Sequence, residues 1–223
     1  MTAIAPPLLA PILLAGRHWF VIDKPAGVAV HAGPRTPQSL EDLLPLYAPG
    51  RPAPQAVHRL DRDTSGCLLI ARRASALHAL SAAFAAGQVR KLYWAVVVNP
   101  PAESSGLVSA PLIKRSTART GWRMHADPAG KPARTHWEVL DRRGKHALLA
   151  LRPETGRTHQ IRVHAALLGP GSAIVGDPVY GAPDPAGMML HARELGFIDP
   201  ETATAQTAEA PCPDRFLKMG FSG

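Results

Sequence analysis

Residues able to do chemistry are densest in two segments, and the first of them is His58-Arg59-Leu60-Asp61-Arg62-Asp63-Thr64-Ser65-Gly66. It follows a Pro-rich stretch and precedes a short apolar run. The carboxylate of Asp61 is flanked by Arg59 and Arg62, whose positive charges favour its ionised form. An ionised aspartate suits a nucleophile or a base. A solvated polar turn explains the same composition, so the segment alone leaves both interpretations open.

The second segment, residues 152–164, reads Arg-Pro-Glu-Thr-Gly-Arg-Thr-His-Gln-Ile-Arg-Val-His. Thr155 is a plausible cap for a helix that begins near Arg157, and a helix N-terminus with an added cation favours an anion. Helical spacing places the polar side chains of Arg157, Gln160 and His164 on or near one face, opposite Ile161 and Leu168. An amphipathic surface helix is the alternative, but this polar face lacks acidic partners four residues away.

Together the two segments resemble the hallmarks of the RluA-type family of RNA pseudouridine synthases. The pattern His-Arg-Leu-Asp-x-x-Thr-Ser-Gly is complete at residues 58–66, and Thr-Gly-Arg-x-His-Gln-Ile-Arg-x-His is complete at residues 155–164. Shorter matches follow in the family's order: Lys24-Pro25-Ala26-Gly27, Lys91-Leu92-Tyr93 with Ala95, and Gly176-Asp177-Pro178-Val179-Tyr180-Gly181 followed by Leu190-His191-Ala192. The resemblance covers about Phe20 to Ala192, and only the link between residues 168 and 176 looks slightly longer than is usual in the family.

This resemblance implies a role for each matching side chain. Asp61 matches the catalytic aspartate, Tyr93 an active-site tyrosine that packs on the target base and is a candidate to assist proton removal, and Arg157 an arginine that pairs with the catalytic carboxylate. Arg59 matches a residue that helps to displace the base, and Arg62 is close enough in sequence to share that task. Two apolar side chains are expected to form walls of the uracil pocket: Ile161 and Leu190.

The implied reaction turns uridine into pseudouridine without a redox step or a group donor, so no cofactor and no metal are expected. The expected partner is a structured RNA, namely ribosomal RNA, transfer RNA or both, with no obligatory protein partner and a monomeric enzyme. Lys and Arg total 25 against 17 Asp and Glu, which leaves a formal charge of +8. This excess favours a polyanion, although a solubilising surface charge would explain it equally well.

Two other functions remain to be weighed against this interpretation. A non-catalytic RNA-binding or assembly factor on the same fold would have no reason to keep the carboxylate of Asp61 among arginines, because it repels phosphate. A zinc-dependent nucleobase deaminase needs a CxxC pair, and Pro211-Cys212-Pro213-Asp214 lacks the second cysteine. Neither Cys67 nor Cys212 has a CxxC partner, so we expect free thiols in a reducing, cytoplasmic compartment.

Patterning along the chain predicts more strands than helices. Strands are expected at residues 17–24, 67–71, 92–98, 106–112, 134–140, 146–151 and 188–191, and helices at 74–86 and 157–168, with a short one near 40–44. Several strands follow one another without a helix between them. This order favours an α+β domain with a mixed, largely antiparallel central sheet flanked by helices.

The organisation predicted is a single catalytic domain over residues 17–223, preceded by a leading arm or first strand at residues 1–16. That arm carries three prolines and no basic residue, unlike a signal peptide. We expect no separate N-terminal RNA-binding module, and no membrane association, since no run of about eighteen apolar residues occurs. The tail from Pro200 to Gly223 is weakly patterned.

Overall fold

The computed structural model describes residues 9–33, 36, 38–117 and 121–222. Its strands are β1 (Ile12–Ala15), β2 (Trp19–Lys24), β3 (Gln55–Ala56), β4 (Ser65–Ala71), β5 (Arg90–Val98), β6 (Ser105–Ser109), β7 (Leu112–Thr117), β8 (Gly121–Ala126), β9 (Arg134–Arg143), β10 (His146–Pro153), β11 (Ala173–Ile174), β12 (Leu190–Ile198) and β13 (Ala205–Glu209). The helices are α1 (Ala74–Ala85), α2 (Gln160–Ala166) and α3 (Asp214–Leu217), with 3-10 turns η1 (Leu40–Asp42) and η2 (Leu44–Tyr47).

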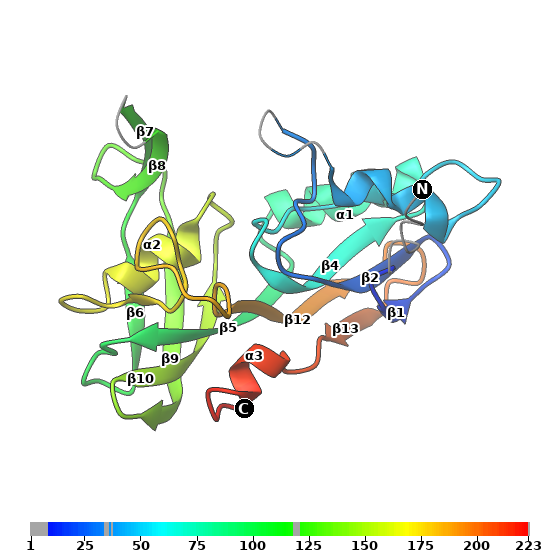
Figure 1. Cartoon of the computed structure of the whole chain (residues 1–223). Helices are drawn as coiled ribbons and strands as arrows, with labels where there is room; N and C mark the ends of the chain where they lie inside the picture. The colour runs from blue at the N-terminus through cyan, green and yellow to red at the C-terminus, as the bar shows by residue number, and fades with distance from the viewer. Residues whose placement is uncertain (1–8, 34–35, 37, 118–120, 223) are drawn as a thin grey trace.

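One large mixed sheet organises the described residues. Its main path runs β1-β2-β4-β12-β5-β10-β9-β6, while β3, β11 and β13 pair with β4, β5 and β12. Every pair is antiparallel except β4 with β12. Strand β12 thereby joins a half built on β2 and β4, which α1 covers, to a half built on β5, β9 and β10, which carries α2 and the separate β7–β8 ribbon (Figure 1). The α+β class and the largely antiparallel sheet are confirmed.

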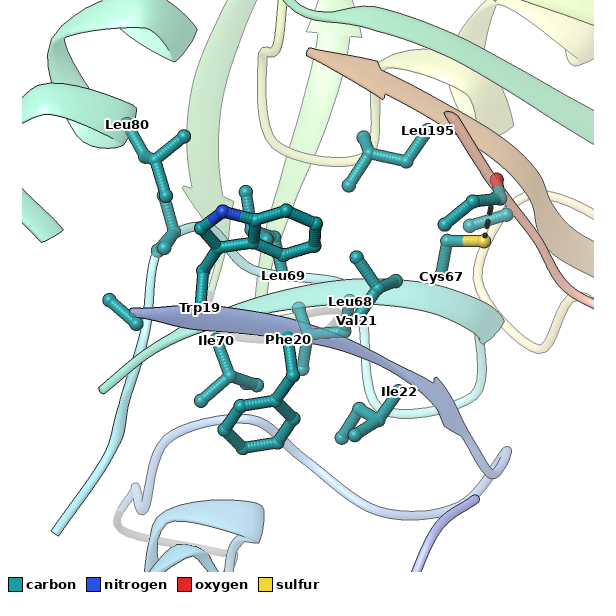
Figure 2. Packing of buried hydrophobic residues seen from close by; sticks show 14 of the residues in the cluster. Trp19, Phe20, Val21, Ile22, Cys67, Leu68, Leu69, Ile70, Leu80 and Leu195 are labelled. Atoms are coloured by element: carbon teal, nitrogen blue, oxygen red, sulfur yellow. Dashed lines mark hydrogen bonds between the residues drawn. The ribbon is translucent and has the colours of Figure 1, made fainter. Parts of the chain in front are cut away.

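Each half of the sheet has its own apolar core. In the first half, β2 and β4 are apolar on both faces, so that Phe20, Ile22, Leu68 and Ile70 are fully buried (Figure 2). A strand buried on both sides reads as a continuous apolar run rather than an alternating one, which is why residues 67–71 were recognisable. The second core lies around β5 and β10 and reaches Ile161 on α2.

Several element boundaries differ from the sequence prediction. The expected strand at residues 106–112 is two strands, because Pro111 has no N–H to offer a ladder and separates β6 from β7. The late strand is also longer than the expected 188–191, and the weakly patterned tail forms β13 and α3. Their pairing partners are distant in sequence, so local propensity does not report them. Within the predicted arm at residues 1–16, Ile12–Ala15 joins the sheet as β1, and residues 1–8 lie outside the described part of the chain.

The parallel contact between β4 and β12 depends on Gly66. Its φ is +107°, and a Cβ at this position would lie 2.2 Å from the carbonyl oxygen of Ala192. Glycine alone has both the backbone freedom and the missing side chain that this approach requires. It fixes the loop before β4, which holds Asp61, against the first residues of β12.

Candidate active site

A cavity of about 120 Å³ opens where the loop before β4, strand β5, the loop before α2 and the start of β12 meet. Its lining joins charged and apolar side chains: Arg59, Leu60, Asp61, Thr64, Lys91, Tyr93, Pro153, Thr155, Gly156, Arg157, Thr158, His159, Gln160, Ile161, Arg162 and Leu190. Segments about a hundred residues apart in the chain therefore meet here. The structure brings together Asp61, Tyr93, Arg157, Arg59, Ile161 and Leu190 of the predicted site.

The carboxylate of Asp61 is held by Arg162. Nη1 of Arg162 donates to Oδ2 of Asp61 at 3.1 Å, while Nε and Nη2 donate to the two carboxylate oxygens of Asp177 at 2.8 and 2.7 Å. Asp177 is fully buried and also accepts the N–H groups of Val179 and Tyr180. Burial acts to raise the pKa of Asp177, but Arg162 and these N–H donors hold it below its usual value. The guanidinium is thus clamped on one edge by Asp177 and presents the other to Asp61.

The pairing expected of Arg157 is wrong, and Arg162 makes it instead. Arg157 lies before α2, is exposed, and donates from Nε to the carbonyl oxygen of Pro132 at 3.1 Å. The helix begins at Gln160 rather than near Arg157, because His159 takes the left-handed conformation with φ +52°. Thr155 is not the cap, and its hydroxyl donates to the side chain of Gln160 at 2.7 Å.

Helix α2 does not have the polar face that its spacing suggested, since Gln160, Arg162 and His164 are all buried. Each has partners that replace water. Gln160 donates to the carbonyl of Arg134 and the hydroxyl of Thr135, and His164 lies 2.8 Å from that same hydroxyl. Buried polar side chains with such partners fix an element in one position. They explain how a helix of seven residues can orient Arg162.

Apolar side chains complete the wall beside the carboxylate. Tyr93 on β5, Ile161 on α2 and Leu190 on β12 all line the cavity. Burial, together with the charge of Asp61, raises the pKa of the Tyr93 phenol, which therefore stays protonated at neutral pH. A neutral ring with two aliphatic neighbours forms a surface suited to a planar heterocycle.

His159 contacts the carboxylate from another side, with Nε2 3.8 Å from Oδ2 of Asp61. Its Nδ1 lies 2.9 Å from the Tyr180 hydroxyl, which accepts the N–H of Met124 at 3.0 Å. The hydroxyl proton of Tyr180 is then available for Nδ1, so neutral His159 carries its proton on Nε2, facing Asp61. Burial lowers the pKa of His159. The ring of Trp122 on β8 lies over it, with centroids 5.0 Å apart.

Arg59 and Arg62 separate in space although they are three residues apart. Arg59 lines the cavity, whereas Arg62 is exposed, pairs with Asp63 at 3.0 Å and is not among the lining residues. Arg62 therefore lies outside the cavity, and a contact of its side chain with RNA stays a prediction. Its backbone carbonyl has a structural contact, because it accepts from Nζ of the fully buried Lys24 at 3.1 Å. Lys24 also donates to the carbonyls of Pro25 and Val28, which ties the Asp61 loop to the turn after β2.

Comparison with known proteins decides the family. A model described as RNA pseudouridylate synthase matches residues 18–167, more than half of the chain. The chain belongs to this family. It is 47% identical over 220 residues to a protein of Zymomonas mobilis named as an RNA pseudouridine synthase, covering 96% of this chain and all of the relative. It is 39% identical to the ribosomal large subunit pseudouridine synthase D of Nitrosomonas europaea, covering 91% of this chain and 62% of that protein.

Solved structures agree with the family. The human RNA pseudouridylate synthase domain containing 1 superposes with a TM-score of 0.78 at 29% identity, covering 94% of this chain and 87% of that one. The human RNA pseudouridylate synthase domain containing 4 gives a TM-score of 0.76 at 26% identity, covering 92% and 90%. The protein is thus an RNA pseudouridine synthase, an isomerase, and not a binding factor without activity.

The sequence assigned no role in the site to three residues that the structure places there: Arg162, His159 and Asp177. A signal for Arg162 existed, since it lies directly between two apolar residues of the helix, Ile161 and Val163. Within the described ranges, no group of three or more His, Cys, Asp or Glu side chains could hold a metal ion. No helix among those residues is long and apolar enough to cross a membrane.

Proposed function

We propose that Asp61 is the catalytic group of this synthase and acts on the ribose of one uridine in large-subunit ribosomal RNA or in transfer RNA. The observation that carries the proposal is the carboxylate of Asp61 in a cavity, fixed by a guanidinium that is itself fixed by Asp177. Such pre-orientation by groups that do not need to move is what a catalytic carboxylate requires. Several relatives are named as large-subunit synthases, which favours ribosomal RNA.

Isomerisation breaks the bond between N1 of uracil and C1′ of the ribose, and forms one between C5 and C1′. The carboxylate of Asp61 can attack C1′ as a nucleophile, with the electron pair of the N1–C1′ bond going to N1; C5 then attacks C1′ and displaces the carboxylate. Alternatively, the carboxylate removes the C2′ proton while the electron pair of the N1–C1′ bond goes to N1, which gives a glycal-type intermediate, and the proton returns to C2′ when C5 adds to C1′. After C5 has joined C1′, the proton on C5 is lost and N1 regains one. Either route begins from ionised Asp61.

The freed uracil must be kept in place while it turns. Tyr93, Ile161 and Leu190 are proposed to hold it by stacking and apolar contact. Because the Tyr93 phenol stays protonated, we assign it the role of a wall in the first step rather than that of a base. Moving the uridine out of the RNA helix costs about a few kcal/mol. Arg59, which lines the same cavity, is proposed to occupy the space that the uridine vacates.

The test is Asp61→Asn, with Asp63→Asn as the matched control. Asp63 is a carboxylate two residues away that pairs with Arg62 and is not among the cavity's lining residues. We expect Asp61→Asn to fold and to bind RNA, with pseudouridine formation reduced at least about a hundredfold. Asp63→Asn should stay near the wild-type rate. Mapping pseudouridine in cellular RNA with and without the gene identifies the target, and a fully active Asp61→Asn enzyme would exclude Asp61.

A further inference from the structure

A second hollow of about 550 Å³ adjoins the catalytic cavity. The two have six lining residues in common, namely Arg59, Lys91, Tyr93, Thr155, Gly156 and Arg157. From this shared edge the second hollow continues to His58 and to the end of α1 at Phe84. We call it the flanking hollow. An RNA strand bound in the catalytic cavity therefore has a continuous path into the flanking hollow.

An aromatic surface stands in the flanking hollow. Phe84 is half-buried, and its ring stacks on His58 with centroids 4.4 Å apart and planes inclined by 22°. His58 cannot turn away, because its Nε2 accepts the N–H of Leu69 at 3.1 Å. Burial lowers the pKa of His58 to about 3, so the stack is neutral at physiological pH. Phe84 is thus a rigid apolar ring with part of its surface open to the hollow.

Positive charge lines the edge that the two hollows share. Within the described part of the chain, neither Arg59 nor Arg157 forms an ion pair with an acid. Lys91 adds a third cation, with Nζ donating to the carbonyl of Thr155 at 3.2 Å. The acid of this lining, Glu154, is already engaged by Arg134 at 3.1 Å and by His136 at 2.7 Å. The shared edge therefore attracts a phosphate.

An open ring next to free cations matches the way proteins hold single-stranded nucleic acid, with bases on aromatic faces and phosphates on cations. Building on the function proposed above, we propose that the flanking hollow binds the nucleotide next to the target uridine. Its base stacks on Phe84, and the phosphate that joins it to the uridine lies between Arg157 and Lys91. Two adjacent nucleotides then leave the RNA helix together. Because every base has a face to stack, this site holds a neighbour without reading its identity.

The test uses a hairpin RNA that carries the mapped target uridine, and two versions that lack the base of the nucleotide before or after it. The variant is Phe84→Leu, which keeps an apolar contact with His58 but loses the ring. Phe84→Tyr restores the ring, and His78→Ala is a control at an exposed site on the same helix. Thermal melting of each variant reports whether the fold is intact.

Wild type should bind one of the two abasic RNAs roughly 5- to 160-fold more weakly than the intact RNA. Phe84→Leu should bind the intact RNA more weakly by a similar factor and lose nothing more on that abasic RNA. Phe84→Tyr and His78→Ala should behave as wild type. The proposal is overturned if wild type binds all three RNAs with equal affinity. It is also overturned if Phe84→Leu weakens binding of the abasic RNA by the same factor as it weakens binding of the intact RNA. Either result leaves the hollow to another occupant, such as a protein segment.

This outcome is separable from the catalytic proposal. Pseudouridine formation by wild type, and its absence in Asp61→Asn, test the proposed function without reference to Phe84. With saturating intact RNA, Phe84→Leu should still convert the uridine, since the carboxylate and its arginine are untouched. A Phe84→Leu enzyme that binds both RNAs normally but cannot react would also reject the flanking hollow as a binding site.

Discussion

Replacing Arg162 by methionine should lower the stability and the reaction rate, whereas the same replacement of Arg157 should weaken RNA binding. Arg162 has a side chain only 7% exposed and bonds two carboxylates, whereas Arg157 is exposed and bonds one backbone carbonyl. Arg162→Met removes the guanidinium but fills much of its volume. It leaves Asp177, which is fully buried, without the cation that offsets its charge. Arg157→Met leaves no buried charge.

The structure sets the size of both effects. Removing one partner of a buried ion pair costs about 3–5 kcal/mol, and about 2–4 °C of melting temperature is lost per kcal/mol in a domain of this size. Arg162→Met should therefore melt roughly 6–20 °C below wild type. Its rate at saturating RNA should fall about 100-fold, because Asp61 is no longer aimed. Arg157→Met should change stability by no more than about 0.5 kcal/mol and weaken RNA binding instead.

The assay combines thermal melting, RNA affinity and single-turnover rates with saturating RNA. A double variant, Arg162→Met with Asp177→Asn, separates stability from chemistry. Neutralising both buried partners should recover much of the lost melting temperature, while the rate stays low since Asp61 still has no guanidinium. The reasoning is refuted if Arg157→Met abolishes the saturating rate while Arg162→Met does not, or if the double variant recovers its rate together with its stability.

Three further outcomes follow from backbone strain, buried charge and surface charge. Gly66→Ala should be strongly destabilised by contact with Ala192, whereas Gly144→Ala, also at positive φ but with open space around it, should lose only about 1–3 kcal/mol by denaturant titration. Lys24 has a pKa lowered by burial from 10.5 to about 7, so the unfolded chain binds its proton more tightly. The stability of wild type relative to Lys24→Met should therefore rise as pH increases from about 7 to 10, and a difference that shrinks would contradict this assignment. RNA affinity should fall steeply with salt, and Arg157→Gln should reduce that slope by about one; an unchanged slope would mean that Arg157 contacts no phosphate.

Local patterns predicted the elements whose signal lies within the element itself. Residues 67–71 read as a buried strand because β4 is apolar on both faces, and α1 ends at Ala85, one residue before the predicted end at residue 86. β13, β3 and β11 are short and depend on partners far away in the chain. Their existence is a tertiary property, which propensity over a few residues does not contain.

The sequence motifs predicted only part of the site. Asp61, Tyr93, Ile161 and Leu190 line one cavity, but the resemblance assigned to Arg157 the carboxylate contact that Arg162 makes. Arg62 neighbours Asp61 in the chain and points elsewhere, while the arginine that contacts Asp61 lies 101 residues away. The left-handed His159 decides which arginine is presented, because it starts the helix after Arg157 and so leaves that arginine outside it. No pattern of residue types in this segment predicts that left-handed turn of the backbone.

Two buried basic side chains hold the loop that carries Asp61, and they act on different parts of it. Lys24 holds the backbone through the carbonyl of Arg62, and Arg162 holds the side chain of Asp61 itself. Each polar group is costly to bury, so each is accompanied by fixed acceptors, three carbonyls for Lys24 and Asp177 for Arg162. Groups already desolvated and bonded before the substrate arrives do not have to reorganise during the reaction. Burying these groups lowers the stability of the protein and fixes Asp61 before the substrate binds. A carboxylate that acts on a ribose carbon or its proton requires this pre-orientation.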